Sequence, residues 1–189
     1  MSSELRPLSY AVIALVGRGG ASAPELVEMA ERGSPLFWTG AASHVYSEAR
    51  RLARLGYLRA SKEPAKTRPR TRYSLTPKAV AAFQAWAPTP APYPRIQHEA
   101  SIRVFALDLL EEPRELAAAF CALVEEIDRL ERLVWELDER RTLLPHRARG
   151  IGLQLSLARR LLAAHRDWAA EVLADLAGEP SGDDRPGRP

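Results

Sequence analysis

Apolar side chains recur every three or four positions along most of the chain, which is the spacing of helices that bury one face. Before residue 88 this spacing predicts helices over about 7–17, from just after Ser22, over 39–56 and over 77–86. Two short runs of strand type, 57–62 and 70–75, precede the last of these helices. The pattern therefore predicts a helical first part that carries one β-hairpin.

Residues that favour helix ends support these boundaries. Ser22 is a good N-cap, and Pro24 and Glu25 suit the first turn that follows it. Thr76 caps the next predicted helix in the same way, with Pro77 at its first position. Both helices are therefore expected to start where their capping residues stand.

A proline-rich break divides the chain. Prolines occupy every second position from Pro88 to Pro94, and proline lacks the amide hydrogen that a continuing helix needs. We expect a stiff connector over 88–95, between a first domain at 1–87 and a helical domain at 96–177. Residues 178–189 are rich in Gly, Pro, Ser and charge, so a disordered tail is expected there.

The second domain is predicted to contain helices over 96–110, 113–141 and 151–176, with a loop at about 145–150. In the middle helix, apolar residues alternate at spacings of four and three, which is a heptad seam that packs against another helix. These residues are Leu116, Phe120, Leu123, Ile127, Leu130, Val134 and Leu137. The last helix of the same chain or a second subunit covers this seam. We assign the seam, together with Trp168, to dimerisation.

Apolar residues of the last predicted helix form a stripe that faces a neighbour. Its centre runs through Leu153, Leu157, Leu161, Ala164, Trp168 and Val172, and Ile151, Leu155, Ala158, Leu162, Ala169 and Leu173 widen it. Aromatic side chains at helical spacing are usually core, although Phe105, Phe120, Trp135 and Trp168 would also suit a small aromatic ligand. The core interpretation is favoured.

Charge is distributed unevenly although the net formal charge is only +3. Residues 1–87 hold 13 Lys and Arg against 6 Asp and Glu, whereas residues 88–189 hold 14 against 18. The two balances are +7 and −4. A basic first part indicates a polyanion as its partner, and the acidic second part indicates a different task.

The predicted helix at 39–56 has one face for the core and one for a ligand. At about 100° per residue, Ala41, Val45, Ala49 and Leu52 fall on one side. Small and basic residues lie opposite or flank them, namely Gly40, Ser43, His44, Ser47, Arg50, Arg51 and Arg54. Small residues let a helix approach base edges in the major groove, and arginine reaches either a guanine edge or a phosphate. Glu48 is expected to form a surface ion pair with Arg51 and to take no part in base reading.

The predicted hairpin is crowded with positive charge. Between residues 59 and 72 a single acid, Glu63, opposes Arg59, Lys62, Lys66, Arg68, Arg70 and Arg72. Such a loop repels itself in isolation, whereas beside DNA each phosphate contact releases counterions. Helix and hairpin together predict a winged helix-turn-helix that binds double-stranded DNA, with the cations from Lys62 onward in the wing. A solvated basic turn beside a solvated helix is the plainer alternative.

These residues resemble the PadR-type transcriptional regulators that have a helical C-terminal domain similar to that of virulence activators. The matching motifs are Leu8-Ser9-Tyr10-Ala11-Val12-Ile13-Ala14-Leu15, Glu25-Leu26, Tyr46 with Arg50-Arg51-Leu52 and Gly56, Pro69-Arg70, and Tyr73-Ser74-Leu75-Thr76. The chain departs from the family where Ala23-Pro24 replaces Gly-Tyr, where Ser47 replaces a proline, and where Ala79 replaces a glycine. The resemblance extends over about residues 8–176.

The resemblance implies a mainly α fold with a small β-hairpin, that is, an N-terminal winged helix-turn-helix plus a C-terminal helical dimerisation domain. It further implies a homodimeric regulator, more often a repressor than an activator. Proteins of this family often respond to a small, frequently aromatic, effector held near the C-terminal helices. By the same analogy Tyr46 and Tyr73 lie near phosphates, although Tyr73 alternates with Leu75 on a strand face that suits the core better. A dimer also fits the two half-sites of a palindromic operator.

Motifs of other function classes are missing from the sequence. It has no Gly-rich phosphate loop, nucleophile elbow, HExxH or paired carboxylates, so we do not expect an enzyme. His44, His98, His146 and His165 are scattered, so neither a metal site nor a cofactor is expected. A protein-interaction module without DNA binding is the alternative, but it would favour apolar residues on the third helix and a neutral hairpin.

The remaining expectations concern location and the one cysteine. No apolar run approaches the roughly 18 residues of a membrane span, and the first residues lack the pattern of a signal peptide. A cytoplasmic protein that does not contact a membrane is therefore expected. Cys121 is the single cysteine, which rules out an intrachain disulfide, and its place beside Phe120 predicts a buried, inert thiol.

Overall fold

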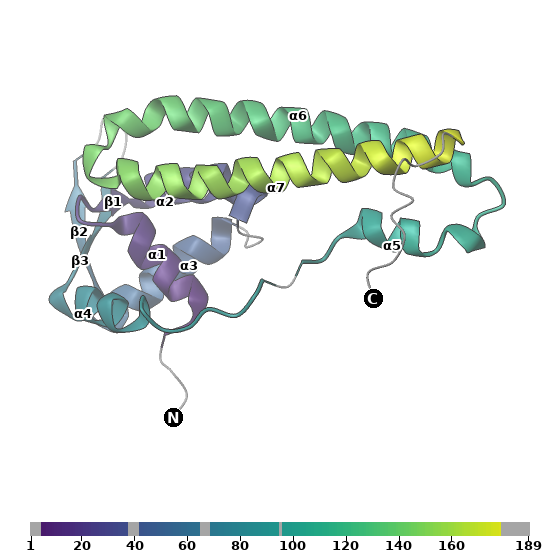
Figure 1. Cartoon of the computed structure of the whole chain (residues 1–189). Helices are drawn as coiled ribbons and strands as arrows, with labels where there is room; N and C mark the ends of the chain where they lie inside the picture. Colours follow the sequence, from purple (N-terminus) through teal and green to yellow (C-terminus); the bar gives the residue numbers. More distant parts are fainter. Residues whose placement is uncertain (1–4, 38–41, 65–68, 95, 179–189) are drawn as a thin grey trace. The chain divides into compact units, whose positions relative to one another are not determined.

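A computed structural model describes residues 5–37, 42–64, 69–94 and 96–178 of the chain. The chain divides into two compact units, Met1–Tyr93 and Pro94–Pro189, and each is described by itself. Helices dominate both units, and the strands lie in the first (Figure 1). The predicted class, mainly α with a small β element, is confirmed.

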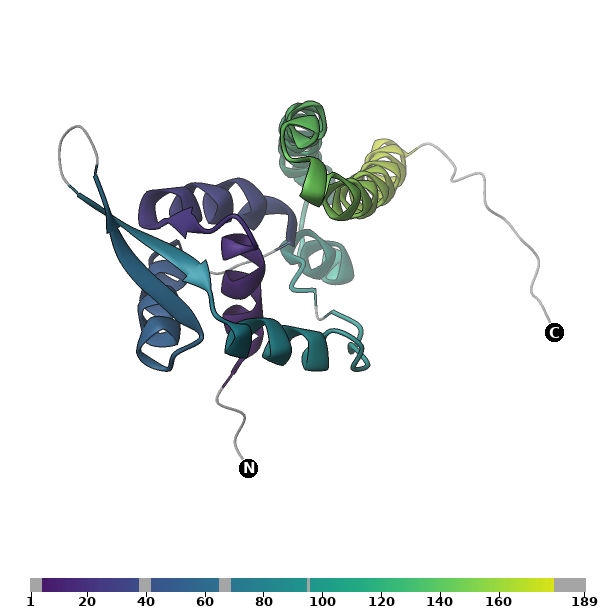
Figure 2. The same cartoon turned by 90° about the vertical axis from the view of Figure 1, so that its left-hand side faces the viewer.

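The first unit combines helices with a small antiparallel sheet. Its elements are α1 (Pro7–Val16), β1 (Ala21–Ser22), α2 (Ala23–Phe37), α3 (Ala42–Arg54), β2 (Leu58–Glu63), β3 (Arg70–Leu75) and α4 (Pro77–Trp86). In the described part the strand order is β1-β3-β2, with Ala21 opposite Tyr73 and Glu63 opposite Arg70. Figure 2 shows the β2-β3 hairpin projecting beyond the helices of this unit.

Local sequence explains why these elements start where they do. The Ser22 hydroxyl accepts a hydrogen bond from the Glu25 amide, and the Glu25 carboxylate accepts one from the Ser22 amide. This reciprocal capping box starts α2. Thr76 accepts from the Ala79 amide at the start of α4, where Pro77 occupies the first position. The predicted capping residues are therefore confirmed.

The sequence did not predict β1. This two-residue strand forms because it pairs with β3, and Gly20 lies at its entrance with a φ of 69°. A Cβ atom on Gly20 would lie 2.8 Å from the Tyr73 carbonyl oxygen, so glycine is required at this close approach.

The core of the first unit connects the helices with the base of the sheet. Val12 of α1, Leu26 of α2, Val45 and Leu52 of α3, and Tyr73 of β3 are all at most 2% exposed and belong to one cluster. Tyr73 therefore packs in the core, as the sequence favoured, and its burial raises the pKa of its hydroxyl. α3 is thereby fixed beside the hairpin.

The second unit is dominated by a long antiparallel helical hairpin (Figure 1). Its elements are α5 (Glu99–Phe105), the 3₁₀ turns η1 (Leu107–Leu109) and η2 (Pro113–Glu115), α6 (Leu116–Arg140), the 3₁₀ turn η3 (Arg141–Leu143) and α7 (Pro145–Ala177). The chain reverses at η3. No helix in the described part is long and apolar enough to cross a membrane.

Two predicted boundaries in this unit are wrong. The helix expected over 96–110 is limited to α5 and the separate turn η1, since the α-helical hydrogen bonding ends near Ala106. The loop expected at about 145–150 is helical, because Pro145 stands at the first position of α7, where its missing amide hydrogen costs little. Gly152 continues this helix and leaves room for the Arg141 side chain, whose guanidinium would lie 2.6 Å from a Cβ there.

The heptad seam of α6 packs against α7 of the same chain. Phe120, Ile127 and Val134 are at most 3% exposed, and the seam residues between them are partly buried. Phe120 forms one cluster with Ala169 and Val172 of α7. Arg166 of α7 adds ion pairs with Asp128 and Glu131 of α6. Dimerisation through this seam remains a prediction. A second subunit would have to contact the seam at its partly exposed residues, because the others are buried against α7.

The apolar stripe of α7 divides into a buried side and an exposed side. The buried side contains Leu155, Ala158, Leu162 and Ala169. In contrast, Leu153, Leu157 and Leu161, which were expected at the centre of the stripe, are 66%, 50% and 38% exposed. Cys121 is also exposed, so the prediction of a buried thiol is wrong. It lies one residue beyond Phe120, about 100° further around the helix, and so falls outside the buried face of α6.

Candidate nucleic-acid interface

The outer face of α3 carries small and basic side chains. Val45, Ala49 and Leu52 point into the core at 1% exposure or less, which confirms the inner face predicted for this helix. On the outer face the exposed residues are Ser43, His44, Ser47, Arg50 and Arg54. Ala41 and Gly40 lie outside the described residues. The outer face therefore offers two guanidinium groups and short polar side chains to a partner.

Tyr46 extends this face along one edge. The residue is 41% exposed, and the Arg50 guanidinium carbon lies 6.0 Å from the centroid of its ring. A cation near an aromatic face is attracted by the ring, which restricts the directions that Arg50 samples. Tyr46 thus helps to orient the arginine at the centre of the outer face.

Arg51 does not belong to this outer face. Its Nε and Nη2 atoms donate to the two carboxylate oxygens of Glu48, both at 2.8 Å, and Nη2 also donates to the Ser9 hydroxyl of α1 at 3.1 Å. The ion pair between Arg51 and Glu48 was predicted, but its expected place on the surface is wrong, because Glu48 is only 9% exposed. The guanidinium of Arg51, which was expected at the flank of this face, is turned towards Ser9 of α1, so its predicted role as a DNA contact is not favoured by this geometry.

The hairpin contributes a second group of cations. Lys62 on β2 and Arg70 on β3 are exposed, and so is Arg59 nearer the base of the hairpin. Thr71 stands opposite Lys62 in the register. Lys66 and Arg68, predicted at the tip, lie outside the described residues. The described part of the hairpin therefore has exposed cations on both strands.

Arg72 has a different environment from the other cations of the hairpin. Its guanidinium donates to the Gly19 carbonyl at 3.0 Å and lies 3.4 Å from the Glu63 carboxylate and 3.7 Å from that of Glu25. The hydrogen bond from the Ser22 amide, with smaller support from Arg72, lowers the pKa of Glu25. Arg72 therefore joins the hairpin to the start of α2, and its predicted role as a DNA contact is not favoured by this geometry.

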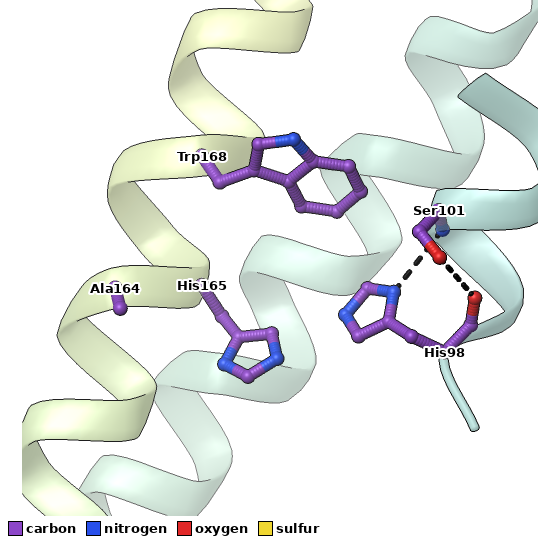
Figure 3. Close-up of a pocket in the computed structure, with 5 residues that line it drawn as sticks. All are labelled: His98, Ser101, Ala164, His165 and Trp168. Atoms are coloured by element: carbon purple, nitrogen blue, oxygen red, sulfur yellow. Dashed lines mark hydrogen bonds between the residues drawn. The ribbon is translucent and has the colours of Figure 1, made fainter. Parts of the chain in front are cut away.

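A separate hollow lies in the second unit. It has a volume of about 240 Å³ and is lined by His98 and Ser101 of the α5 region and by Ala164, His165 and Trp168 of α7 (Figure 3). The two imidazole rings stack with their centroids 5.0 Å apart, and the Trp168 ring stands edge-on to His98 at 5.1 Å. No sequence pattern indicated this pair, because His98 precedes α5 and His165 lies in α7, far away along the chain.

Hydrogen bonds assign the tautomers of these histidines. His98 Nδ1 accepts from the Ser101 amide at 3.1 Å, so in the neutral ring the proton is on Nε2. His165 Nδ1 lies 2.7 Å from the Leu161 carbonyl oxygen, which only accepts, so here the proton is on Nδ1. Burial, with a smaller contribution from His165, lowers the pKa of His98. The hollow thus offers one donor and one acceptor.

The four aromatic residues predicted for either a core or a pocket do not come together. Phe120 and Trp168 pack edge to face at 5.4 Å. Phe105 and Trp135 are 90% and 63% exposed, so for these two both predictions are wrong. Among the described residues, no three His, Cys, Asp or Glu side chains are placed to share a metal ion.

Comparison with known sequences gives no family for this chain. No model of a protein family matches it, and no curated protein matches it either.

Solved structures give a consistent fold. Bacillus subtilis PadR in complex with operator DNA superposes with a TM-score of 0.78 at 18% identity. A PadR-like transcriptional regulator of Bacillus cereus gives 0.74 at 14%, and the Vibrio cholerae virulence activator AphA gives 0.67 at 21%. Each comparison covers 92% of this chain and 99% of the other. A further structure of B. subtilis PadR, with p-coumaric acid, gives 0.68 at 19%, with 91% and 99% covered. The predicted resemblance to PadR-type and virulence-activator structures is therefore confirmed for the fold.

Proposed function

We propose that this chain is a sequence-specific DNA-binding transcriptional regulator. The observation that carries the proposal is the exposed face of α3, with Ser43, Ser47, Arg50 and Arg54, next to a hairpin with Lys62 and Arg70 exposed. A helix of this kind fits the major groove, and a basic hairpin fits the neighbouring backbone or minor groove. The PadR structure solved with operator DNA has the same fold and supports this assignment.

The residues of the two elements have different tasks in this proposal. Ser43 and Ser47 allow the start of α3 to approach the bases, and Arg50 reads a base edge because its place on the outer face is central. Lys62 and Arg70, with Lys66 and Arg68, contact phosphates, which gives affinity without sequence preference. Arg54, near the end of α3, is assigned to a phosphate.

A homodimer is part of the proposal. One winged helix covers about half of a palindromic operator, so two subunits read it together. The exposed residues Leu153, Leu157 and Leu161 of α7 and Trp135 of α6 provide apolar surface that a second copy would cover. Repression is the simplest result, because a dimer bound at its operator blocks access to that DNA.

The hollow beside His98 and His165 is the proposed effector site. Its wall is largely apolar, and its Nε2 atoms offer one hydrogen-bond donor and one acceptor. A small aromatic molecule with a hydroxyl or carboxylic acid group matches this combination. PadR solved with p-coumaric acid shows that a protein of this fold binds such a molecule. Calorimetric titration of p-coumaric acid into the wild-type protein and into His165→Ala tests the site. The proposal expects weaker binding by the variant, and equal heats of binding for the two proteins would exclude this hollow as the site.

The DNA-binding proposal is tested with the organism's own genome. Purified full-length protein is incubated with genomic fragments, the retained DNA is sequenced, and the enriched fragment is titrated by fluorescence anisotropy beside a scrambled duplex. The proposal expects tighter binding of the enriched fragment and weaker binding of both duplexes at higher salt. If neither duplex is bound at low ionic strength, the protein is not a DNA-binding regulator. If the protein binds other proteins but not DNA, the alternative of a protein-interaction module is favoured.

A further inference from the structure

Ser9, Glu48 and Arg51 form a closed network between α1 and α3. Arg51 holds both oxygens of the Glu48 carboxylate, and the Ser9 hydroxyl donates to one of them at 2.5 Å. The same hydroxyl accepts from Arg51 and from the Arg6 amide at 2.9 Å. Each hydrogen-bonding group of the serine and each oxygen of the glutamate therefore has a partner within the first unit.

Burial makes this network sensitive to the loss of one member. Ser9 is fully buried, and Glu48 is 9% exposed beside the core residues Val45, Ala49 and Leu52 of the same helix. The hydrogen bonds from Arg51 lower the pKa of Glu48 more than burial raises it, so the carboxylate is charged at neutral pH. A buried charge without its partner is unfavourable. The Glu48 carboxylate therefore keeps the Arg51 guanidinium at hydrogen-bonding distance.

The network also affects the charge that α3 presents. Arg50 and Arg54 are exposed on the outer face, whereas the positive charge of Arg51 is matched by a carboxylate at hydrogen-bonding distance. The side chain of Arg51 is 30% exposed, at the edge of the helix between α1 and the outer face. A long, flexible arginine at this edge would reach a phosphate if its carboxylate partner were absent.

We propose that Glu48 determines the specificity of the DNA interface, because it holds Arg51 against Ser9 and so withholds one cation of α3 from the DNA. The proposal rests on the proposed function, since it assumes that α3 enters a groove. Fewer phosphate contacts lower the affinity for every sequence equally, so a larger share of the binding free energy depends on the bases. Glu48 is thus a positioning residue that acts through Arg51.

The salt dependence of binding distinguishes this role from simple support of the fold. The logarithm of the binding constant falls with the logarithm of the salt concentration by about 0.9 for each phosphate contact. The experiment measures this slope for the enriched operator and for a scrambled duplex with full-length wild-type protein, Glu48→Gln, Arg51→Gln and the double variant. Arg54→Gln is the matched control for an exposed cation of the same helix.

The expected results differ among the four variants. Glu48→Gln steepens the slope by about 0.9 per subunit and reduces the preference for the operator over the scrambled duplex, because Arg51 gains a phosphate. Arg51→Gln leaves the slope of the wild type unchanged, and adding it to Glu48→Gln restores that slope. Arg54→Gln flattens the slope. A residue with a purely structural role would change stability without steepening the slope.

Two results would overturn the proposal. One is a flatter slope for Arg51→Gln, which would mean that Arg51 already contacts DNA. The other is an unchanged slope and operator preference for a folded Glu48→Gln variant. Circular dichroism shows whether Glu48→Gln and Arg51→Gln are folded, and only folded variants are compared. If Glu48→Gln is not folded, a flatter slope for Arg51→Gln still overturns the proposal, whereas an unchanged slope supports the view that the charge of Arg51 is withheld from DNA. If the wild-type protein binds no DNA, the proposed function itself fails. This result is distinct from the two results that would overturn the role of Glu48.

Discussion

The two units differ in how completely they bury their apolar side chains. In the first unit the helices and sheet close around one core, in which Val12, Leu26 and Leu52 have no exposed surface. In the second unit, Phe105 and Leu109 are 90% and 79% exposed, and Leu153 is 66% exposed. Large apolar surfaces usually mark a contact with another molecule. The first unit therefore has a closed core and exposes cations on α3 and the hairpin, whereas the second exposes more apolar surface suited to a partner.

This contrast suggests that the two units bind different partners. Exposed cations on α3 and the hairpin suit a polyanion, whose contacts are polar and depend on salt. Exposed leucines on α7 suit a second copy of the chain, whose contacts are apolar. Substitutions in one unit should therefore change DNA binding directly, and those in the other should change it through assembly.

The largest effect is expected from a charge placed on the exposed stripe of α7. Leu157→Glu should convert a dimer into a monomer, because a carboxylate would be buried without a partner. Operator affinity should then fall by roughly 100-fold or more, since the two half-sites are no longer bound by linked subunits. Light scattering after gel filtration gives the mass. Ala163→Glu, an exposed position outside the stripe, is the control. A Leu157→Glu protein that remains dimeric would remove this face from the interface.

The next effect concerns base reading by α3. Arg50→Ala should weaken operator binding by about 1–3 kcal/mol and relax the preference at one base pair, if Arg50 contacts a guanine edge. Anisotropy titrations with single base-pair changes measure both quantities. Arg160→Ala, an exposed arginine of α7, is the control and should leave binding unchanged. Equal operator affinities for Arg50→Ala and wild type would show that the outer face of α3 does not read the DNA.

A smaller effect is expected from the hairpin, and two of its arginines should respond differently. Arg70→Ala should weaken binding to operator and scrambled DNA alike and flatten the salt dependence by about 0.9 per subunit. Arg72→Ala should instead lower the thermal stability, because Arg72 bonds the Gly19 carbonyl and pairs with Glu63. Thermal melts and salt titrations on both variants separate these roles. The assignment fails if Arg70→Ala changes only the melt.

The smallest effect is a pH dependence in the second unit. Burial lowers the pKa of His98 in the folded chain, so the unfolded chain binds this proton more readily. The neutral ring therefore contributes stability above the ordinary histidine pKa of about 6.5, and this contribution is lost as the pH falls. Protonation also removes the acceptor of the Ser101 amide. Amide exchange of α5 should accelerate from pH 8 to pH 5, after correction for the intrinsic rate. His98→Asn, which keeps a capping side chain, should reduce this change.

Periodic features of the first unit could be predicted from the sequence. The inner and outer faces of α3 follow from helical spacing alone, and β3 spans Arg70–Leu75 as predicted. Capping residues gave the starts of α2 and α4 because their hydrogen bonds are local. The element that was missed, β1, has no sequence pattern of its own and exists only through its pairing with Tyr73 and Arg72.

Contacts between distant positions could not be predicted in the same way. The partner of Glu48 on α3 was found within the same helix, but Ser9 lies on another helix, and its approach depends on how α1 and α3 pack. For the same reason the stacked rings of His98 and His165 had no signal in the sequence. Pro145 and Gly150 indicated a loop, although proline is favourable at the first position of a helix and α7 accommodates both.

Hydrogen–deuterium exchange of the intact protein, with and without its enriched DNA fragment, tests the central claim most directly. The account predicts that DNA slows exchange in peptides that cover α3 (Ala42–Arg54) and the hairpin strands (Leu58–Glu63 and Arg70–Leu75). A scrambled duplex at the same salt concentration should protect the hairpin more than α3. Protection that excludes α3 and the hairpin, despite DNA binding, would contradict the account.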